Sequence, residues 1–110
     1  MKSPVRIGDL RHRVAIERAQ RTSDGGGGAS VIWVLVDEVW GGLWPRTADE
    51  AFALDRVAGK ATHDIWIRHR RDVAPEMRMR IGARVFDILG AIDVEDRKRF
   101  LRCIVEERDL

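Results

Sequence analysis

Residues 31–45 have the sequence VIWVLVDEVWGGLWP, and this stretch decides the fold class. Its first six residues form an apolar run rich in β-branched side chains, and residues 39–44 continue the pattern after two acidic residues. Such runs are typical of strands, so we predict one long or bent strand. Gly41 and Gly42 weaken a straight strand and predict a bulge or sharp bend of the kind that closes small barrels. The final proline lacks an N–H donor and should end the pairing.

The segment before this strand predicts the other half of a hairpin. Apolar and polar residues alternate over residues 10–17, with Val14 and Ile16 on one face, and this period of two predicts a half-buried strand. Residues 25–28 are all glycine, which carries maximal backbone freedom and has no side chain to pack. We therefore predict a flexible hairpin tip over residues 24–30.

The segment after this strand predicts a helix. Thr47 stands three residues before Glu50, which forms a capping box, and Gly59 is placed to end the helix. Leu54 and Val57 share one face, whereas Phe52 points away from it. Burial of both faces requires more than one packing partner, so we expect a neighbouring subunit or a channel on one side. The candidate interface residues of this helix are Thr47, Glu50, Phe52, Leu54 and Val57.

Alternating apolar residues continue to the end of the chain. They predict strands at residues 64–68, 77–81, 85–92 and 100–106. With one helix inserted at about residues 46–61, between the second and third strands, this order excludes a βαβ fold. It predicts a mainly β protein, a small antiparallel β-barrel or sandwich of five to six strands in a single domain spanning residues 1–110.

Composition limits the class of protein. Of the 110 residues, 45% are hydrophobic and 35% are charged, which suits one soluble domain without cross-links. Cys103 is the only cysteine, so neither an intramolecular disulfide nor a cysteine metal cluster is expected, and a reducing cytoplasmic compartment fits. The N-terminal ten residues lack the apolar core of a signal peptide. We expect neither secretion nor membrane insertion.

No chemical constellation in the sequence supports catalysis, metal binding or a cofactor. His12, His63 and His69 lie on separate predicted strands or strand ends, without metal-ligand spacing. The acidic residues of the predicted helix are already explained by its capping and its dipole. Cys103 alternates inward with its apolar neighbours, so we expect it to be buried. The glycine run lacks the lysine and serine or threonine of a phosphate-binding loop.

A basic run follows the third predicted strand. Arg68, Arg70 and Arg71 are candidates for contact with the DNA backbone or with a partner protein, because arginine forks match phosphate oxygens. A solvated strand end is the alternative. The four tryptophans could stack on nucleic-acid bases, but we expect core and interface packing, with at least two of them buried. They are Trp33, Trp40, Trp44 and Trp66.

The collinear order of these residues over about residues 6–107 resembles the head-tail adaptor (head-closure, or stopper) family of tailed phages. The resemblance is carried by Ile7, Leu10, Arg11, His12, Arg13, Ile16, Trp33, Val39, Trp40, Leu43, Pro45, Thr62, His63, Ile65, Ile67, Arg68, Met77, Arg84, Phe86, Ile88, Cys103 and Glu106. It implies a non-enzymatic β-barrel subunit, six or twelve copies of which form a ring. In that family a loop after the second strand projects into the channel and the ring retains packaged DNA. Here residues 46–61 take that position, and their capped helix departs from a flexible plug and favours packing between subunits.

The resemblance also implies partners and a location. Portal and adaptor proteins would lie above the ring, tail terminator or tail proteins below it, and packaged DNA could touch it through backbone charge alone, without sequence readout. The protein would occupy the bacterial cytoplasm during assembly and then the neck of a phage or gene transfer agent particle. The rival hypothesis is a small β-barrel nucleic-acid-binding module whose basic strands and tryptophans track a single strand.

Overall fold

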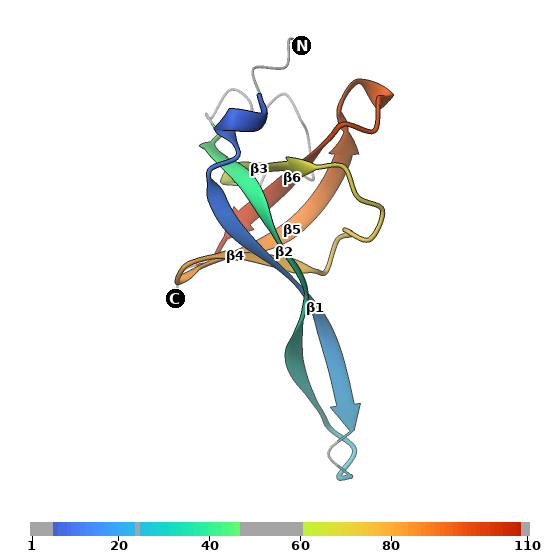
Figure 1. Cartoon of the computed structure of the whole chain (residues 1–110). Helices are drawn as coiled ribbons and strands as arrows, with labels where there is room; N and C mark the ends of the chain where they lie inside the picture. Colours follow the sequence, from blue (N-terminus) through green and yellow to red (C-terminus); the bar gives the residue numbers. More distant parts are fainter. Residues whose placement is uncertain (1–5, 24, 47–60, 109–110) are drawn as a thin grey trace.

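The computed structural model describes residues 6–23, 25–46 and 61–108, and it shows six antiparallel strands (Figure 1). They form a closed barrel in the order β1-β2-β3-β6-β5-β4, which confirms the predicted mainly β fold. The strands are β1 (His12–Ser23), β2 (Ala29–Pro45), β3 (His63–Arg68), β4 (Arg78–Ile81), β5 (Arg84–Asp93) and β6 (Phe100–Glu107). Two short 3-10 helices, η1 (Ile7–Asp9) and η2 (Val94–Asp96), cover the ends of strands. The predicted helix over residues 46–61 falls almost entirely outside the described residues.

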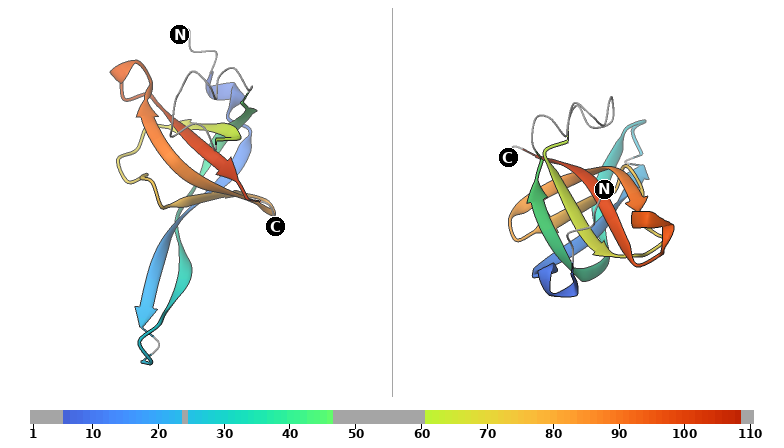
Figure 2. Two further views of the ribbon diagram at one scale, coloured as in Figure 1. Left: turned by 180° about the vertical axis from the view of Figure 1, so that it is seen from behind. Right: turned by 90° about the horizontal axis from the view of Figure 1, so that it is seen from above.

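The first hairpin is much longer than the barrel. β1 pairs with β2 along its whole length, from His12 opposite Gly41 to Ser23 opposite Ala29, with the glycine run between the two strands as predicted for a hairpin tip. The barrel uses only their inner halves, because β4 pairs with β1 at residues 15–17 and β3 pairs with β2 at residues 41–45. The outer halves project beyond the barrel as an arm, here residues 18–23 and 29–35 (Figures 1 and 2).

The core lies inside the barrel and follows the alternation of the sequence. Val14 and Ile16 of β1 are fully buried, as the period of two predicts. Cys103 of β6 is also fully buried, and this burial raises the pKa of its thiol to about 12, so the thiol stays protonated at neutral pH. The rest of the main cluster is Ile65, Ile67, Met79, Phe86, Ile88, Leu101 and Val105.

The glycines of β2 do not form the predicted bulge. The register shifts instead between Ile16 and Glu17, so that Val36 is the extra residue on β2. Gly41 is needed for close approach, because a Cβ atom there would lie 2.7 Å from the Val14 side chain and 3.1 Å from the Trp66 carbonyl oxygen. At Gly42 a Cβ atom would overlap the ring of Trp44. Gly41 is therefore crowded by the neighbouring strands β1 and β3, whereas Gly42 is crowded by the Trp44 ring of its own strand and by the Asp9 carbonyl oxygen.

A smaller apolar cluster lies on the outer face of the barrel. Trp66 packs edge-on against Trp44 and also contacts Phe100, and Leu10 completes the buried set. Trp66 is the only one of the four tryptophans that is buried, so the expectation of at least two buried tryptophans is wrong. The physical reason is that Trp33 and Trp40 lie on stretches of β2 that no described strand covers on its outer edge.

The two ends of the undescribed segment 47–60 are tied together. The Arg46 amide donates to the Thr62 carbonyl oxygen at 2.9 Å, and the Thr62 amide donates to Val105 at 2.9 Å. The guanidinium of Arg46 pairs with the buried carboxylate of Asp64, which Arg102 also contacts at 2.9 Å. The residues on either side of segment 47–60 therefore lie side by side, at the end of the barrel opposite the arm (Figure 1).

Candidate interaction surfaces

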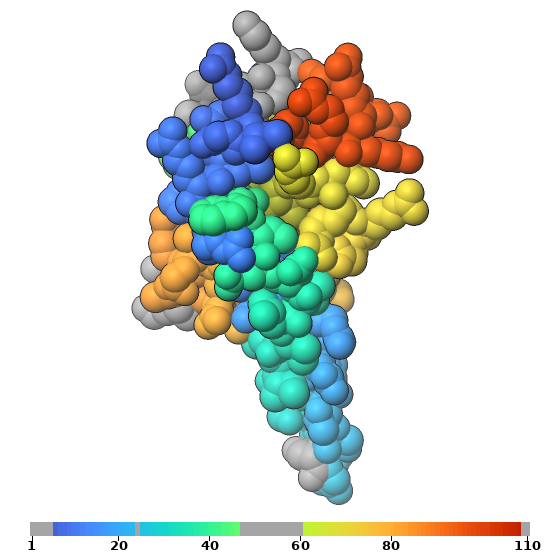
Figure 3. All heavy atoms as spheres, in the orientation of Figure 1, coloured from blue at the N-terminus to red at the C-terminus, as the bar shows by residue number. Residues whose placement is uncertain are grey.

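The arm has one polar strand and one apolar strand. Its β1 half, residues 18–23, carries only exposed side chains, among them Arg18 and Arg21. Its β2 half, residues 29–35, has no charged residue. Val31, Ile32 and Leu35 are 47%, 52% and 56% exposed, although their run is typical of a strand buried on both faces. Figure 3 shows this arm standing clear of the rest of the molecule.

The base of the arm is braced against the barrel by β4. The Arg78 guanidinium donates to the Glu17 carboxylate at 2.6 Å and lies 4.2 Å from the centroid of the Trp33 ring. Arg80 approaches the second oxygen of the same carboxylate at 3.4 Å. Glu17 is buried, and its neighbour across the bulge is the arm residue Leu35. One arginine thus holds both strands of the arm, which fixes the direction in which the arm leaves the barrel.

A groove of about 640 Å³ lies where β2 and β3 diverge. Its apolar lining includes two side chains that are more than half exposed, Ile7 at 56% and Trp40 at 53%. Leu10 and Val39 complete the apolar lining. The polar lining is Arg13, Glu38, Arg68, His69 and Arg70. Exposed apolar side chains of this size around a concave surface are typical of an interaction site.

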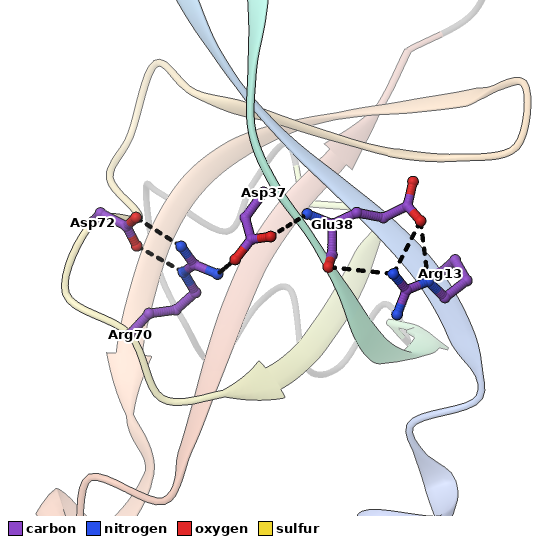
Figure 4. A network of polar contacts seen from close by, with 5 residues as sticks. All are labelled: Arg13, Asp37, Glu38, Arg70 and Asp72. Carbon is purple, nitrogen blue, oxygen red and sulfur yellow. Dashed lines mark hydrogen bonds and ion pairs between the residues drawn. The ribbon is translucent and has the colours of Figure 1, made fainter.

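Ion pairs border the groove and link its elements (Figure 4). Arg70 donates to Asp72 at 2.7 Å and to Asp37 at 2.6 Å, which ties the loop after β3 to β2. Arg13 pairs with Glu38 at 3.0 Å and its guanidinium lies 4.7 Å from the centroid of Trp40. Hydrogen bonds from Arg70 hold the pKa of Asp37 and the pKa of Asp72 below the ordinary value for an aspartate. These carboxylates therefore stay charged and paired over the whole neutral range.

The structure places the three candidate arginines differently. Arg70 is engaged with two carboxylates, which leaves its positive charge largely compensated. Arg68 and Arg71 are exposed, and Arg68 also lines the groove. The candidate helix residues Thr47, Glu50, Phe52, Leu54 and Val57 lie outside the described residues.

The histidines lie apart from one another. His63 sits edge-on to Phe86 and shares a hydrogen bond of 2.8 Å with the Thr62 hydroxyl. Burial lowers its pKa, and the nearby Arg84 acts in the same direction while Glu107 opposes it. His69 lies 3.8 Å from Asp93. Within residues 6–23, 25–46 and 61–108, no three metal-ligating side chains gather at one point.

Sequence reasoning missed the arm and the groove. Residues 31–36 were correctly predicted as strand, but the sequence did not indicate that Val31, Ile32 and Leu35 would be exposed outside the barrel. The available signal was the mismatch between the two halves of the hairpin, since a polar strand faces an uncharged one across the glycine tip. The groove unites η1, β2 and the end of β3, and no local pattern brings these together.

The chain was compared with a family model and with solved structures, and both gave matches over nearly its whole length. A family model described as phage head completion protein matches residues 5–108. Protein SF1141 from Shigella flexneri 2a, solved in solution, is 25% identical, with 94% of this chain and 96% of that chain covered and a TM-score of 0.76. A chain from the virion of a native gene transfer agent particle is 27% identical, with coverages of 90% and 96% and a TM-score of 0.63. A comparison with curated proteins finds no match. No helix in the described part of the chain is both long and apolar enough to span a membrane.

Proposed function

Because the chain belongs to the phage head completion protein family, we propose that its copies form a six- or twelve-fold ring that closes the head. Portal and adaptor proteins bind one face of this ring, and tail terminator or tail proteins bind the other. Membership of the family makes the protein a structural component of a virion or gene transfer agent particle and not an enzyme. Its task in this proposal is geometric, since repeated contacts between identical subunits surround a channel.

The exposed apolar strand of the arm is the observation that carries this proposal. Complete burial of a side chain such as Ile32 or Leu35 contributes about 1.5–3 kcal/mol, and the isolated chain leaves much of this unused. An uncovered apolar surface of this kind favours association. The arm extends a molecule whose principal dimensions are 52 × 28 × 26 Å, so it reaches far enough to contact a neighbour while the barrel keeps its own core.

The segment at the other end of the barrel supplies a second contact in this proposal. Arg46 and Thr62, which lie on either side of residues 47–60, are hydrogen-bonded to each other at 2.9 Å. Thr47 and Glu50 cap a helix whose faces, with Leu54 and Val57 on one side and Phe52 on the other, pack against a neighbouring subunit or line the channel. In this proposal the arm and residues 47–60 are two separate contact elements of one subunit, which suits a subunit that joins a head-side ring to a tail-side ring.

Retention of packaged DNA is the further part of the proposal. Arg68 and Arg71 are exposed and would contact phosphates without reading the sequence, whereas Arg70 serves the ion pairs beside the groove. Binding of the isolated protein to single-stranded oligonucleotides across a salt series separates the proposed ring from the rival nucleic-acid-binding module. Weak binding is expected. Tight, strongly salt-dependent binding would instead favour the rival nucleic-acid-binding module.

The ring itself is tested by making particles with a variant protein that carries a charged residue on the apolar strand of the arm. Leu35→Asp should leave heads and tails unjoined in electron micrographs, because a carboxylate cannot be buried in an apolar interface without a partner. Thr22→Asp is the matched control, since Thr22 is exposed on the polar strand of the same arm, and it should yield joined particles. Equal unfolding midpoints for both variants would show that the barrel is intact. Normal joining with Leu35→Asp would overturn the proposed role of the arm.

A further inference from the structure

We propose that the groove formed by Ile7, Leu10, Val39 and Trp40 receives the apolar arm strand of a second copy of this chain. The inference rests on the proposed ring and names the contact that builds it. Each subunit inserts its arm into the groove of the next one, so the contact is made by two different surfaces of the same molecule. Repetition of such a heterologous contact closes a ring when the rotation between neighbours divides a full turn.

Most of the charges that line the groove are already paired. Arg13 is paired with Glu38 at 3.0 Å, and Arg70 is paired with both Asp37 and Asp72, whereas Arg68 is exposed. A charged segment entering the groove would have to compete with these pairs or lose its hydration without compensation. Residues 29–36 contain no charged residue, and their large exposed side chains, Val31, Ile32 and Leu35, are aliphatic. An arm strand of this composition can enter the groove without disturbing these ion pairs, and it matches the apolar part of the lining.

The groove also offers backbone groups to an incoming strand. β2 begins to pair with β3 only at Gly41, and within the described ranges no strand pairs with the outer edge of β2 from residue 29 to residue 40. At one end of this edge the Glu38 amide is already capped by the Asp37 carboxylate at 2.8 Å. Val39 and Trp40 follow it within the groove. An exposed apolar edge of this kind is a template for strand addition, and an extended β-strand is the occupant it fits.

The arm of the same chain does not fill the groove. Arg78 holds the base of the arm through Glu17 and Trp33, and the arm points away from the η1 end of the groove (Figure 1). Folding back would break the 2.6 Å contact to a buried carboxylate, which is costly. The arm therefore stays extended, where the groove of another copy can bind it.

Disulfide formation in assembled particles, between two variants that each carry one introduced cysteine, tests this contact. Ile32→Cys and Trp40→Cys are produced together in cells that make the particles, and neck proteins are analysed without reductant. Val31→Cys and Leu35→Cys, each with Trp40→Cys, cover neighbouring registers, because a disulfide tolerates only a narrow range of Cβ separations. Cys103 gives little background, since it is fully buried and its pKa is raised to about 12. Thr22→Cys with Trp40→Cys is the control on the polar strand.

A crosslinked dimer that requires one arm cysteine and one groove cysteine supports the inference. A dimer formed by Ile32→Cys alone would indicate contact between arms and would overturn it. Joined particles without any arm-to-groove crosslink in the three registers would also overturn it. Because the particles in this last outcome are joined, the failure concerns the groove and leaves the proposed ring standing. Failure of the ring itself is seen separately, as normal joining by Leu35→Asp.

Discussion

The two halves of the β1–β2 hairpin differ in the burial of their apolar side chains although they belong to the same pair of strands. Within the barrel, Val14 and Ile16 are completely buried. In the arm, Ile32 and Leu35 are more than half exposed. The boundary is the bulge at Val36, beside which Glu17 and Arg78 form their ion pair. Apolar side chains of one hairpin thus form the core at one end and remain exposed at the other.

The difference shows that hydrophobic content alone does not say what a strand packs against. In the barrel, apolar residues alternate with polar ones, which is typical of a strand with one covered face. In the arm, β2 is apolar on both faces and lies beside a polar partner strand. When a strand is apolar on both faces and still exposed, covering it with a second protein molecule would be favourable, because the apolar surface would be removed from water.

The barrel and the arm should differ most in how much stability the chain loses when a leucine in each is replaced by alanine, and Leu101 is the leucine in the barrel. Leu101 is buried in the barrel core, so Leu101→Ala should lower the free energy of unfolding by about 2–5 kcal/mol through lost contacts and the cavity left behind. Urea denaturation followed by tryptophan fluorescence measures this change. A loss below about 1 kcal/mol would show that the barrel is not the cooperative unit that holds the chain together.

The brace between barrel and arm should show the next largest effect. Arg78→Ala leaves the buried Glu17 carboxylate with only Arg80, and hydrogen bonds to charged groups contribute about 1.5–3 kcal/mol each. We expect a loss of about 2 kcal/mol in this range, together with broader amide resonances for arm residues in NMR spectra.

Arg80→Ala is the control for the brace. Its side chain is largely exposed and lies 3.4 Å from the same carboxylate, so we expect a loss below about 1 kcal/mol and an unchanged arm. Equal losses for the two variants would contradict the bracing role of Arg78.

Much of the barrel was predictable from the sequence because alternation determines which face of a strand is buried. The inward positions of Val14, Ile16, Leu101, Cys103 and Val105 were all expected from their spacing and are all buried. The six strands and the hairpin tip at the glycine run were expected on the same grounds. These features depend on neighbours within a few residues, which is the range that sequence patterns report.

The features that were not predictable depend on residues far apart in the chain. Arg78 and Glu17 are separated by 61 positions, and neither residue carries a local signal of the other. The crowding that requires Gly41 comes from Val14 and Trp66, so the glycines were wrongly interpreted as a bulge. The exposure of Val31, Ile32 and Leu35 depends on where the barrel ends along the hairpin, and no local pattern within the arm reports that boundary.

The pH dependence of folding should also originate in the barrel. Burial lowers the pKa of His63, so the unfolded chain binds a proton more readily than the folded chain does. This contribution to stability is complete above pH 6.5, the ordinary value, and is lost as pH falls through it towards the folded pKa. His63→Gln should flatten this shallow slope in denaturation midpoints. An NMR titration that placed the His63 pKa above 6.5 would contradict the assigned cause.

Truncation of a side chain in the arm should have the smallest effect on the stability of the chain and a larger effect on assembly of the particle. Leu35→Ala makes the same chemical change as Leu101→Ala, but Leu35 is 56% exposed and lies in the arm. We expect its free energy of unfolding to change by less than about 0.5 kcal/mol in the isolated protein, as for other surface substitutions. In particles, the same variant should weaken the joining of heads to tails, because the truncated side chain no longer fills an apolar interface. A loss comparable to that of Leu101→Ala would mean that the arm packs within its own subunit, and the distinction between a folding half and an associating half of the hairpin would fail.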